Sequence, residues 1–299
     1  MKIQSLSILV PAPCTNQCPF CVSRMNTDRQ ENYLHKSHIE KFLESNNTIH
    51  ELSFIKAWKE RLEYVSNLDV HSLMLTSTGE AMLNLNFIRF FGVVNNNLEK
   101  PFRFIELQTS GMNMTTKNIE KLMLAGVKTI SLSLSSLDTE ENYVCNNPTN
   151  IKHKVDIDEV CKLIKAHHIN LRLSLNLTKH FENKSLSDTF NRLTQLGANQ
   201  VIFRKLYTSD NESLPQNKWI KNNSVDDTYL DELSKYIHKH GKIIDKNFLG
   251  VPRYDIHGIS TVLDEDCMSQ EMADNYRYLI LKPDCHLYTK WQEPASLLF

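Results

Sequence analysis

The sequence predicts an α/β fold in which parallel strands alternate with helices and a C-terminal extension of short strands follows. Three observations lead to this prediction. Six short segments rich in β-branched and large apolar residues are each bounded by turn residues. Segments with the 3.6-residue period of an amphipathic helix lie between them. After Gly241 this alternation ends and only short extended segments follow. Strands that alternate with helices pair in parallel through right-handed crossovers.

The predicted strands share a composition of Ile, Leu, Val, Phe and Thr. They are QSLSILV (4–10), SLMLTS (72–77), FRFIELQT (102–109), KTISLSLS (128–135), NLRLSLNL (170–177) and QVIFRKLY (200–207). The predicted helices include FIKAWKERLEYV (54–65), NIEKLMLAG (118–126), DIDEVCKLIKAHH (156–168), SLSDTFNRLTQLG (185–197) and VDDTYLDELSKYIHKHG (225–241). Gly126 is a suitable residue to end the second of these helices.

No internal repeat and no low-complexity linker divides the chain. We therefore expect a core barrel over residues 1–210 and a C-terminal helix and short-strand extension over residues 211–299 that packs on it. The extended segments are KIIDKNFLG, YDIHGISTVL and YRYLILKPDCHLYTKW. Because six strands make an open barrel, these segments are expected to cover its mouth or its edge.

Composition excludes several classes of function. The chain has 299 residues, 41% hydrophobic and 23% charged, with a formal net charge of −1, so neither nucleic-acid nor membrane binding is indicated. Its N-terminus resembles a first strand and not a signal peptide. No apolar run approaches the roughly 20 residues that span a bilayer. Seven cysteines, an odd number, argue against a disulfide framework, and we expect a cytoplasmic protein.

Unusual residues gather where the predicted strands end. Three cysteines follow the first strand, STGE (77–80) ends the second and QTSG (108–111) ends the third, with Ser133 and Ser135 on the fourth, Asn176 on the fifth and Arg204 on the sixth. In parallel α/β folds ligands bind at the carboxyl ends of the strands. One mouth is therefore expected to collect all of these residues.

The cysteines Cys14, Cys18 and Cys21 lie in PAPCTNQCPFCVSRM (11–25), with no fourth cysteine nearby. Thiolates favour zinc or the iron of iron–sulfur clusters, and a structural zinc requires four ligands. The nearest following histidines, His35 and His38, are irregularly spaced. Three thiolates on a loop suit a four-iron cluster with one iron left open. A zinc knuckle, or three unrelated thiols, is the alternative.

At these residues the sequence resembles the radical S-adenosylmethionine (radical SAM) superfamily. The spacing C-x3-C-x2-C with Phe20 before the last cysteine is similar to its signature. STGE resembles its Gly-Gly-Glu motif with Thr78 in place of the first glycine, and LQTSG resembles its Thr-Asn-Gly turn. SLSSLD (133–138) resembles the fourth-strand segment of molybdopterin-precursor synthases, with Ser135 where Asp is common. The resemblance covers residues 4 to about 207 and implies a partial (βα)6 TIM-like barrel.

The resemblance also implies cofactors. Cys14, Cys18 and Cys21 would each bind one iron of a 4Fe-4S cluster, and S-adenosylmethionine would chelate the fourth through its amino and carboxylate groups. Reductive cleavage at the cluster would release a 5′-deoxyadenosyl radical that abstracts hydrogen from a substrate. An external one-electron donor of the flavodoxin or ferredoxin type would supply the electron.

Other matching residues would contact S-adenosylmethionine. The backbone of Phe20 would meet the adenine. Thr78, Gly79 and Glu80 would hold the methionyl amino group, although Glu80 is also placed to cap the following helix. Thr109 and Ser133 would reach the methionyl carboxylate or the ribose, and Asn176 the ribose or the adenine.

Substrate contacts are less defined in the sequence. Arg172 and Arg204 are either inward anion ligands or surface charges, and the strand register does not decide between them. Arg172 matches a substrate-binding Lys of the molybdopterin-precursor synthases. His257 and Trp291 of the extension either contact substrate or pack. Cys267 and Cys285 are too few to hold an auxiliary cluster, and no cobalamin-binding segment is expected. The substrate is a small molecule, a nucleotide or a peptide; the alternative is a non-catalytic metal-binding or regulatory protein on the same fold.

Overall fold

A single twelve-stranded sheet organises the computed structural model, which describes residues 2–25, 49–70, 72–246, 250–265, 271–272, 275–291 and 294–298. The strands are β1 (Lys2–Leu9), β2 (Ser72–Thr76), β3 (Phe104–Thr109), β4 (Val127–Leu134), β5 (Asn170–Asn176), β6 (Gln200–Arg204), β7 (Lys242–Lys246), β8 (Pro252–Ile256), β9 (Ile259–Asp264), β10 (Glu271–Met272), β11 (Asn275–Leu281) and β12 (Leu287–Tyr288). Their order is β10-β11-β1-β2-β3-β4-β5-β6-β9-β8-β7, and β12 pairs with β11.

Eight neighbouring strands of this sheet are parallel. β1 to β6 pair in chain order, β11 pairs in parallel with β1 at one end, and β9 pairs in parallel with β6 at the other. β7, β8, β10 and β12 pair antiparallel at the margins. Within the described residues no pairing joins β9 to β11, so the sheet is open. The predicted α/β class and the parallel order of the six core strands are confirmed.

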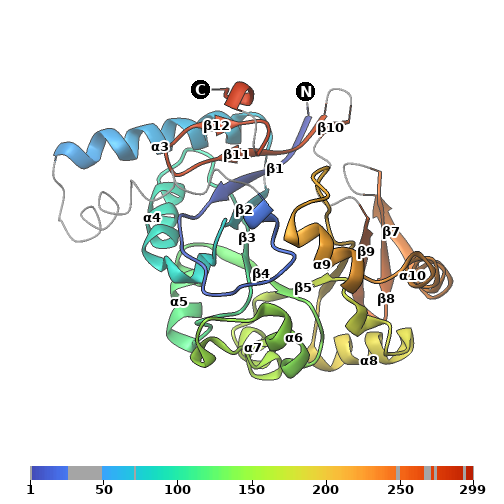
Figure 1. Ribbon diagram of the computed structural model, residues 1–299. Coiled ribbons are helices and arrows are strands. Elements are labelled where there is room, and N and C mark those ends of the chain that lie inside the picture. The colour runs from blue at the N-terminus through green and yellow to red at the C-terminus, as the bar shows by residue number, and fades with distance from the viewer. Residues whose placement is uncertain are drawn as a thin grey trace.

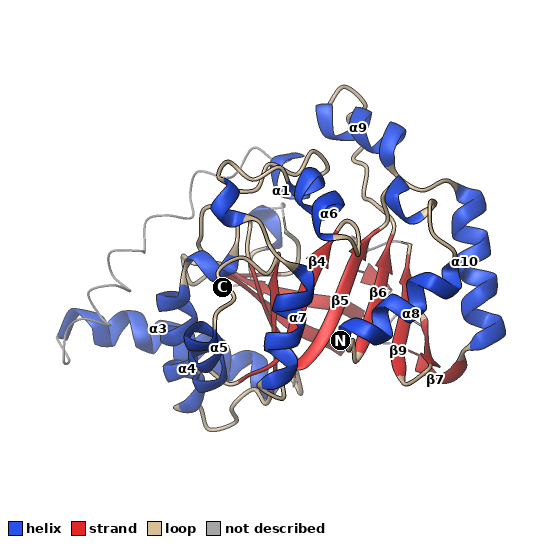
Figure 2. Cartoon of the chain, turned by 90° about the horizontal axis from the view of Figure 1, so that it is seen from below, coloured by secondary structure: helices blue, strands red, loops and turns tan. Residues whose placement is uncertain are grey.

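Most of the helices lie outside the curved sheet, whereas α1 (Val22–Met25) and α9 (Pro215–Asn223) lie beyond the ends of its strands, as Figures 1 and 2 show. The described helices are α1 (Val22–Met25), α3 (Ile49–Asn67), α4 (Leu85–Asn96), α5 (Thr116–Leu124), α6 (Thr139–Asn146), α7 (Ile157–Ala166), α8 (Leu186–Leu196), α9 (Pro215–Asn223) and α10 (Asp227–His240). The five helices expected from the sequence are present, and α1, α4, α6 and α9 are additional. None of the described helices combines the length and the apolar composition that a bilayer span requires.

Local sequence explains where these helices start and stop. In α7 the buried residues Ile157, Val160, Cys161 and Ile164 follow the helical period, and the side chain of Asp156 caps the first turn. Gly197 ends α8 with φ +74°, a left-handed conformation that suits glycine at a helix end. α7 therefore presents one apolar face to the protein core.

The two faces of the sheet differ in polarity. On β5, Leu171, Leu173 and Leu175 are completely buried. The alternate residues Arg172, Ser174 and Asn176 are polar. Parallel strands are usually apolar on both faces because helices cover both. A polar inner face indicates that the space inside the curve is a binding pocket and not a packed core.

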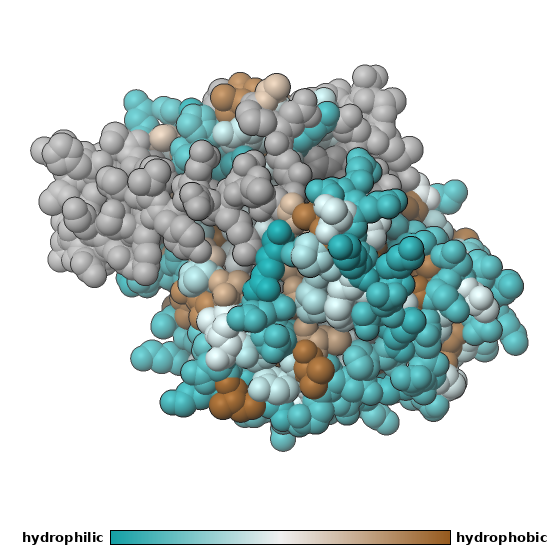
Figure 3. All heavy atoms as spheres, viewed as in Figure 1, coloured by the Kyte–Doolittle hydropathy of each residue, from teal (hydrophilic) through white to brown (hydrophobic). Residues whose placement is uncertain are grey.

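The C-terminal extension forms the two margins of the sheet. β9 continues it beyond β6 and β11 continues it beyond β1, so the described strands of the extension share a sheet with the core. Of the two expected positions, mouth or edge, these strands therefore occupy the edge. The side of the molecule seen in Figure 3 is mostly hydrophilic among the coloured residues, with hydrophobic side chains in small separate groups.

Candidate active site

A pocket of about 820 Å³ opens inside the curve of the sheet. It takes residues from each of the six core strands and from β9 and β11. The six core strands contribute Ser7, Thr76, Gln108, Ser133, Asn176 and Arg204, among others. Most of these lie at or near the carboxyl end of their strand, where loops leave the sheet. The expected gathering of polar residues at one mouth is present.

The cysteine loop, residues 10–21, connects β1 to α1 at this mouth. Cys18 and Cys21 line the pocket and are half-buried, whereas Cys14 is exposed. The loop is fastened to the C-terminal end of α6, since the amide of Gln17 donates to the carbonyl of Asn146 at 2.8 Å. The Cys18 Sγ lies 3.5 Å from Asn146 Oδ1. This tertiary contact holds the cysteines over the pocket.

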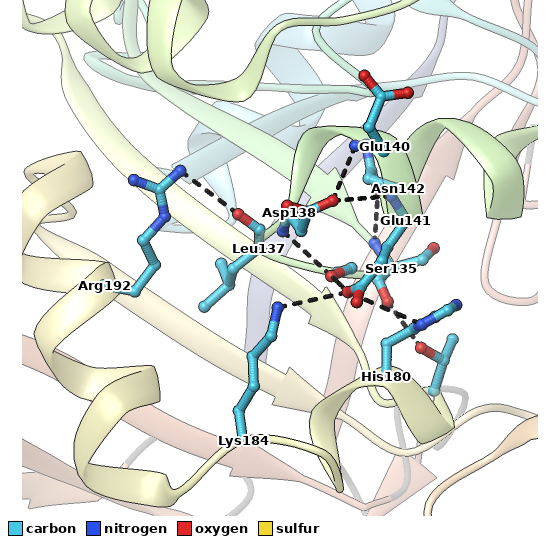
Figure 4. Close-up of polar contacts among 11 residues, drawn as sticks. Ser135, Leu137, Asp138, Glu140, Glu141, Asn142, His180, Lys184 and Arg192 are labelled. Carbon is cyan, nitrogen blue, oxygen red and sulfur yellow. Dashed lines mark hydrogen bonds and ion pairs between the residues drawn. The ribbon is translucent and has the colours of Figure 1, made fainter.

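The turn between β4 and α6 has its own polar network (Figure 4). The Asn142 Oδ1 accepts a hydrogen bond of 2.9 Å from the amide of Ser135, and Asp138 accepts from two amides of the first turn of α6. These amides hold the pKa of Asp138 below its usual range. Glu141 pairs with Lys184 at 3.3 Å. The network fixes the start of α6 and thereby the end that holds the cysteine loop.

The STGE segment packs directly against the cysteine loop. The Ser77 hydroxyl donates to the carbonyl of Val10 at 2.7 Å, and the amide of Glu80 donates to the carbonyl of Pro13 at 2.9 Å. A Cβ atom at Gly79 would lie 2.1 Å from the carbonyl oxygen of Ala12. Glycine is required here because two backbone segments touch.

Replacing Gly79 with alanine is expected to displace the cysteine loop and to lower iron uptake, because the backbone atoms next to it cannot move aside as a side chain would. The expected loss of folding free energy is about 3 kcal/mol or more. Gly258→Ala is the control, since nothing lies within 4 Å of its Cβ position. Its positive φ costs only about 1 kcal/mol. Chemical denaturation and iron analysis of both variants check this; equal iron uptake in Gly79→Ala and wild type would contradict it.

Glu80 is buried and accepts four hydrogen bonds within the protein. One oxygen accepts from the Met82 amide at 3.0 Å and from the Thr109 hydroxyl at 2.6 Å. The other accepts from the amide and the hydroxyl of Ser110, at 2.8 and 2.5 Å. Glu80 thus caps the short 3₁₀ helix that follows and ties the end of β2 to the end of β3. The capping role expected as an alternative is present.

Burial raises the pKa of the Cys18 thiol to about 12, and the nearby Cys21 and Cys14 add to the shift. The six described cysteines, these three and Cys145, Cys161 and Cys285, are free of disulfides. Metal binding at Cys18 must therefore displace a proton. Cys267 lies outside the described residues.

Solved structures place this arrangement among known folds, whereas no protein-family model matches the sequence and a search of curated proteins finds no match. SuiB of Streptococcus suis with S-adenosylmethionine bound has a TM-score of 0.57 at 12% identity, over 96% of this chain and 60% of SuiB. HemN of Escherichia coli, coproporphyrinogen III oxidase, is described as a radical SAM enzyme. It has a TM-score of 0.52 at 14% identity, over 89% of this chain and 63% of HemN. The chain has the radical SAM fold. It spans about three fifths of the length of these proteins.

The residues present fit the cluster that the radical SAM fold implies. Among the described residues no three His, Cys, Asp or Glu side chains are grouped closely enough to share one metal ion. A tetrahedral zinc would bring its thiolates within about 4 Å of one another, given zinc–sulfur distances near 2.3 Å. In a cluster each thiolate binds a different iron, so its ligands stand further apart. Three soft thiolates at an open loop suit iron and sulfide.

The residues predicted from the radical SAM resemblance form two groups. Phe20, Thr78, Ser133 and Asn176 line the pocket. Gly79, Glu80 and Thr109 stand behind it, where they join the cysteine loop, β2 and β3. The residues of the second group hold the backbone segments that carry the first group.

The three predicted substrate contacts differ in their surroundings. Arg172 and Arg204 line the pocket, so their side chains face inward. His257 does not line it; it is exposed in the turn between β8 and β9, at the opposite end of β9 from Asp264. Trp291, by contrast, is in the pocket wall. The structure does not bring His257 to the site.

Two residues of the site escaped sequence reasoning. Asn146 of α6 contacts Cys18, and Trp219 of α9 lies beside Phe20 in a tilted arrangement with ring centroids 5.5 Å apart. Both contacts join segments that are more than 120 residues apart. The sequence analysis predicted neither α9, which carries Trp219, nor α6, which carries Asn146, so neither residue was singled out.

Proposed function

We propose that this chain is a radical SAM enzyme with one 4Fe-4S cluster bound by Cys14, Cys18 and Cys21. The observation that carries the proposal is the position of the three cysteines. They lie on the loop after β1, and two of them line a pocket at the carboxyl ends of parallel strands. The radical SAM fold of the chain supports it. When bound and reduced, the cluster and S-adenosylmethionine together supply a 5′-deoxyadenosyl radical that abstracts hydrogen from a substrate.

The side chains of the pocket orient S-adenosylmethionine in this proposal. Thr78 is half-buried in the wall and offers its hydroxyl and backbone to the methionyl amino group, and Ser133 and Asn176 offer polar groups across the pocket. Phe20, held against Trp219, meets the adenine. Gly79, Glu80 and Thr109 fix the loop on which these contacts depend.

The pocket walls also exclude water. Holding the donor and the acceptor of a hydrogen atom in place is the main contribution that side chains make to such a reaction. A closed pocket prevents the reactive species from meeting solvent or the wrong bond. Trp291 and Tyr278, in edge-to-face contact at 6.0 Å, form part of the wall on the β11 side.

The partners of the reaction follow from the same proposal. An external one-electron donor of the flavodoxin or ferredoxin type reduces the cluster, and the substrate is a small molecule, a nucleotide or a peptide. SuiB has been solved with its precursor peptide SuiA bound. An oxygen-sensitive cluster and unpaired thiols fit the reducing cytoplasm, where we place the protein.

Anaerobic reconstitution tests the proposal. The loaded protein is expected to hold about four irons and four sulfides per chain, to be brown, and to bleach with dithionite. With dithionite and S-adenosylmethionine it is expected to form 5′-deoxyadenosine and methionine. A colourless protein that holds one zinc would support the non-catalytic alternative and refute the proposal.

A further inference from the structure

Two arginines of the sheet reach the pocket, but their electrostatic situations differ. Arg172 of β5 forms an ion pair with Glu106 of β3, and its Nε donates to Gln200 at 2.7 Å. Glu106 also accepts a hydrogen bond of 3.4 Å from the side-chain Nε2 of Gln108. The charge of Arg172 is therefore compensated inside the protein. Arg172 therefore stabilises the inner face of the sheet, and its compensated charge attracts an anion less than an unpaired guanidinium would.

Arg204, the last residue of β6, lacks such compensation. It lines the pocket, and its Nε is buried without a hydrogen-bond partner among the described residues. Nor does its guanidinium pair with a carboxylate in that part of the chain. A buried charged donor without a partner is unfavourable, because it has lost its hydration and gained nothing in exchange.

Other cations of the pocket wall have partners. Arg277 pairs with Asp264 at 2.9 Å. Arg253 binds Asp245 through two nitrogens, and Lys205 lies 3.3 Å from Asp227. Lys282, also in the wall, lies over the Tyr288 ring, with its Nζ 4.1 Å from the ring centroid. Among the described cations of the wall, Arg204 is thus the one with neither a carboxylate nor an aromatic partner.

Further polar atoms of the inner face share this lack of partners. Ser7 Oγ on β1 and Ser174 Oγ on β5 are buried, and neither has a hydrogen-bond partner in the described residues. Asn176 is paired in register with Arg204 across β5 and β6. The pocket wall therefore offers the Asn176 side chain on the strand next to Arg204, and the unpaired Ser7 hydroxyl on β1.

We propose that Arg204 binds an oxyanion, a carboxylate or a phosphate, of the substrate from which hydrogen is taken. This inference rests on the proposed function and specifies its substrate as an acid. The planar fork of a guanidinium matches two oxygens of a carboxylate or phosphate, and the bond is strongest where water is excluded. S-adenosylmethionine also carries a carboxylate, so the test must distinguish binding of a substrate oxyanion from binding of the methionyl carboxylate.

The test measures binding of inorganic phosphate to the full-length, cluster-loaded protein, by calorimetry in low salt, with and without saturating S-adenosylmethionine. Wild type is expected to bind one phosphate per chain in both conditions. Arg204→Gln should weaken phosphate binding at least tenfold and leave the affinity for S-adenosylmethionine within threefold. Arg253→Gln, the same change at a paired arginine of the wall, should change phosphate affinity by less than threefold.

Folding is followed separately. Arg204→Gln is expected to keep the melting temperature of the wild type, whereas Arg172→Gln should lower it, because Glu106 is then buried without its partner. If Arg204→Gln does not fold, the inference is tested by the phosphate stoichiometry of wild type and of Arg204→Lys. Lysine keeps the positive charge but cannot bind two oxygens at once as the planar guanidinium does.

Three results would overturn the inference. The first is no phosphate binding to wild type, and the second is equal binding in wild type and Arg204→Gln. The third is that S-adenosylmethionine displaces phosphate and that Arg204→Gln binds S-adenosylmethionine tenfold more weakly. This result would assign Arg204 to the methionyl carboxylate. Iron content and 5′-deoxyadenosine are measured without phosphate, so failure of the proposed function is seen independently.

Discussion

Alanine at any one of Cys14, Cys18 or Cys21 is expected to remove most of the iron and to abolish cleavage of S-adenosylmethionine. Each thiolate binds a different iron in the proposed cluster, so no remaining cysteine of the set can replace the one that is lost. Iron and sulfide are measured after anaerobic reconstitution, and 5′-deoxyadenosine is measured by chromatography. The expected loss is nearly complete in all three variants.

The remaining cysteines provide the controls for this experiment. Cys285 is buried and does not line the pocket, and Cys267 lies outside the described residues. Cys267→Ser and Cys285→Ser are expected to keep the wild-type iron content. A full cluster in Cys14→Ala would show that the ligand assignment is wrong. Iron above four per chain that disappears in the two control variants would reveal a second cluster in the extension.

Glu80→Ala is expected to weaken S-adenosylmethionine binding by roughly 1 to 3 kcal/mol and to keep the iron, because Glu80 holds in place the strand ends on which the cofactor contacts depend. The loss of its acceptors leaves the Met82 amide and the Thr109 and Ser110 groups unpaired, so the end of β3 loosens from β2. The variant should also be less stable, by about 3 kcal/mol. Equilibrium dialysis with S-adenosylmethionine, denaturation and iron analysis provide the three readouts.

Ser133→Ala is the comparison for Glu80→Ala. It removes one hydroxyl from the pocket wall and no bracing contact, so a smaller loss of S-adenosylmethionine affinity is expected without a change in stability. If both variants bind S-adenosylmethionine as tightly as wild type, the residues at the strand ends do not form the cofactor pocket.

The sequence contains enough local information to predict the core strands and the mouth of the pocket. Strand composition and turn residues locate β1 to β6 within a few residues of their observed ends, since alternation with helices constrains both. Parallel order then brings the cysteine loop, Thr78, Ser133 and Asn176 to one edge without any knowledge of contacts. These features depend on neighbours in the chain.

Features that depend on distant contacts could not be predicted. The strand register places Arg172 beside Glu106 and Gln200 and leaves Arg204 without such partners. A slip of one residue would turn the side chains of both arginines to the other face of the sheet. Asn146 reaches the cysteine loop only because α6 is fixed by its own turn. The edge positions of β9 and β11 likewise result from pairing over the whole length of the chain.

The central claim is that one iron of a cluster held by three cysteines is open to S-adenosylmethionine. Electron paramagnetic resonance of the dithionite-reduced protein, before and after adding S-adenosylmethionine, tests it most directly. The account predicts the signal of one reduced four-iron cluster per chain, with g-values that shift when S-adenosylmethionine binds the open iron. A cluster signal that S-adenosylmethionine leaves unchanged, at concentrations where binding is measured, would contradict it.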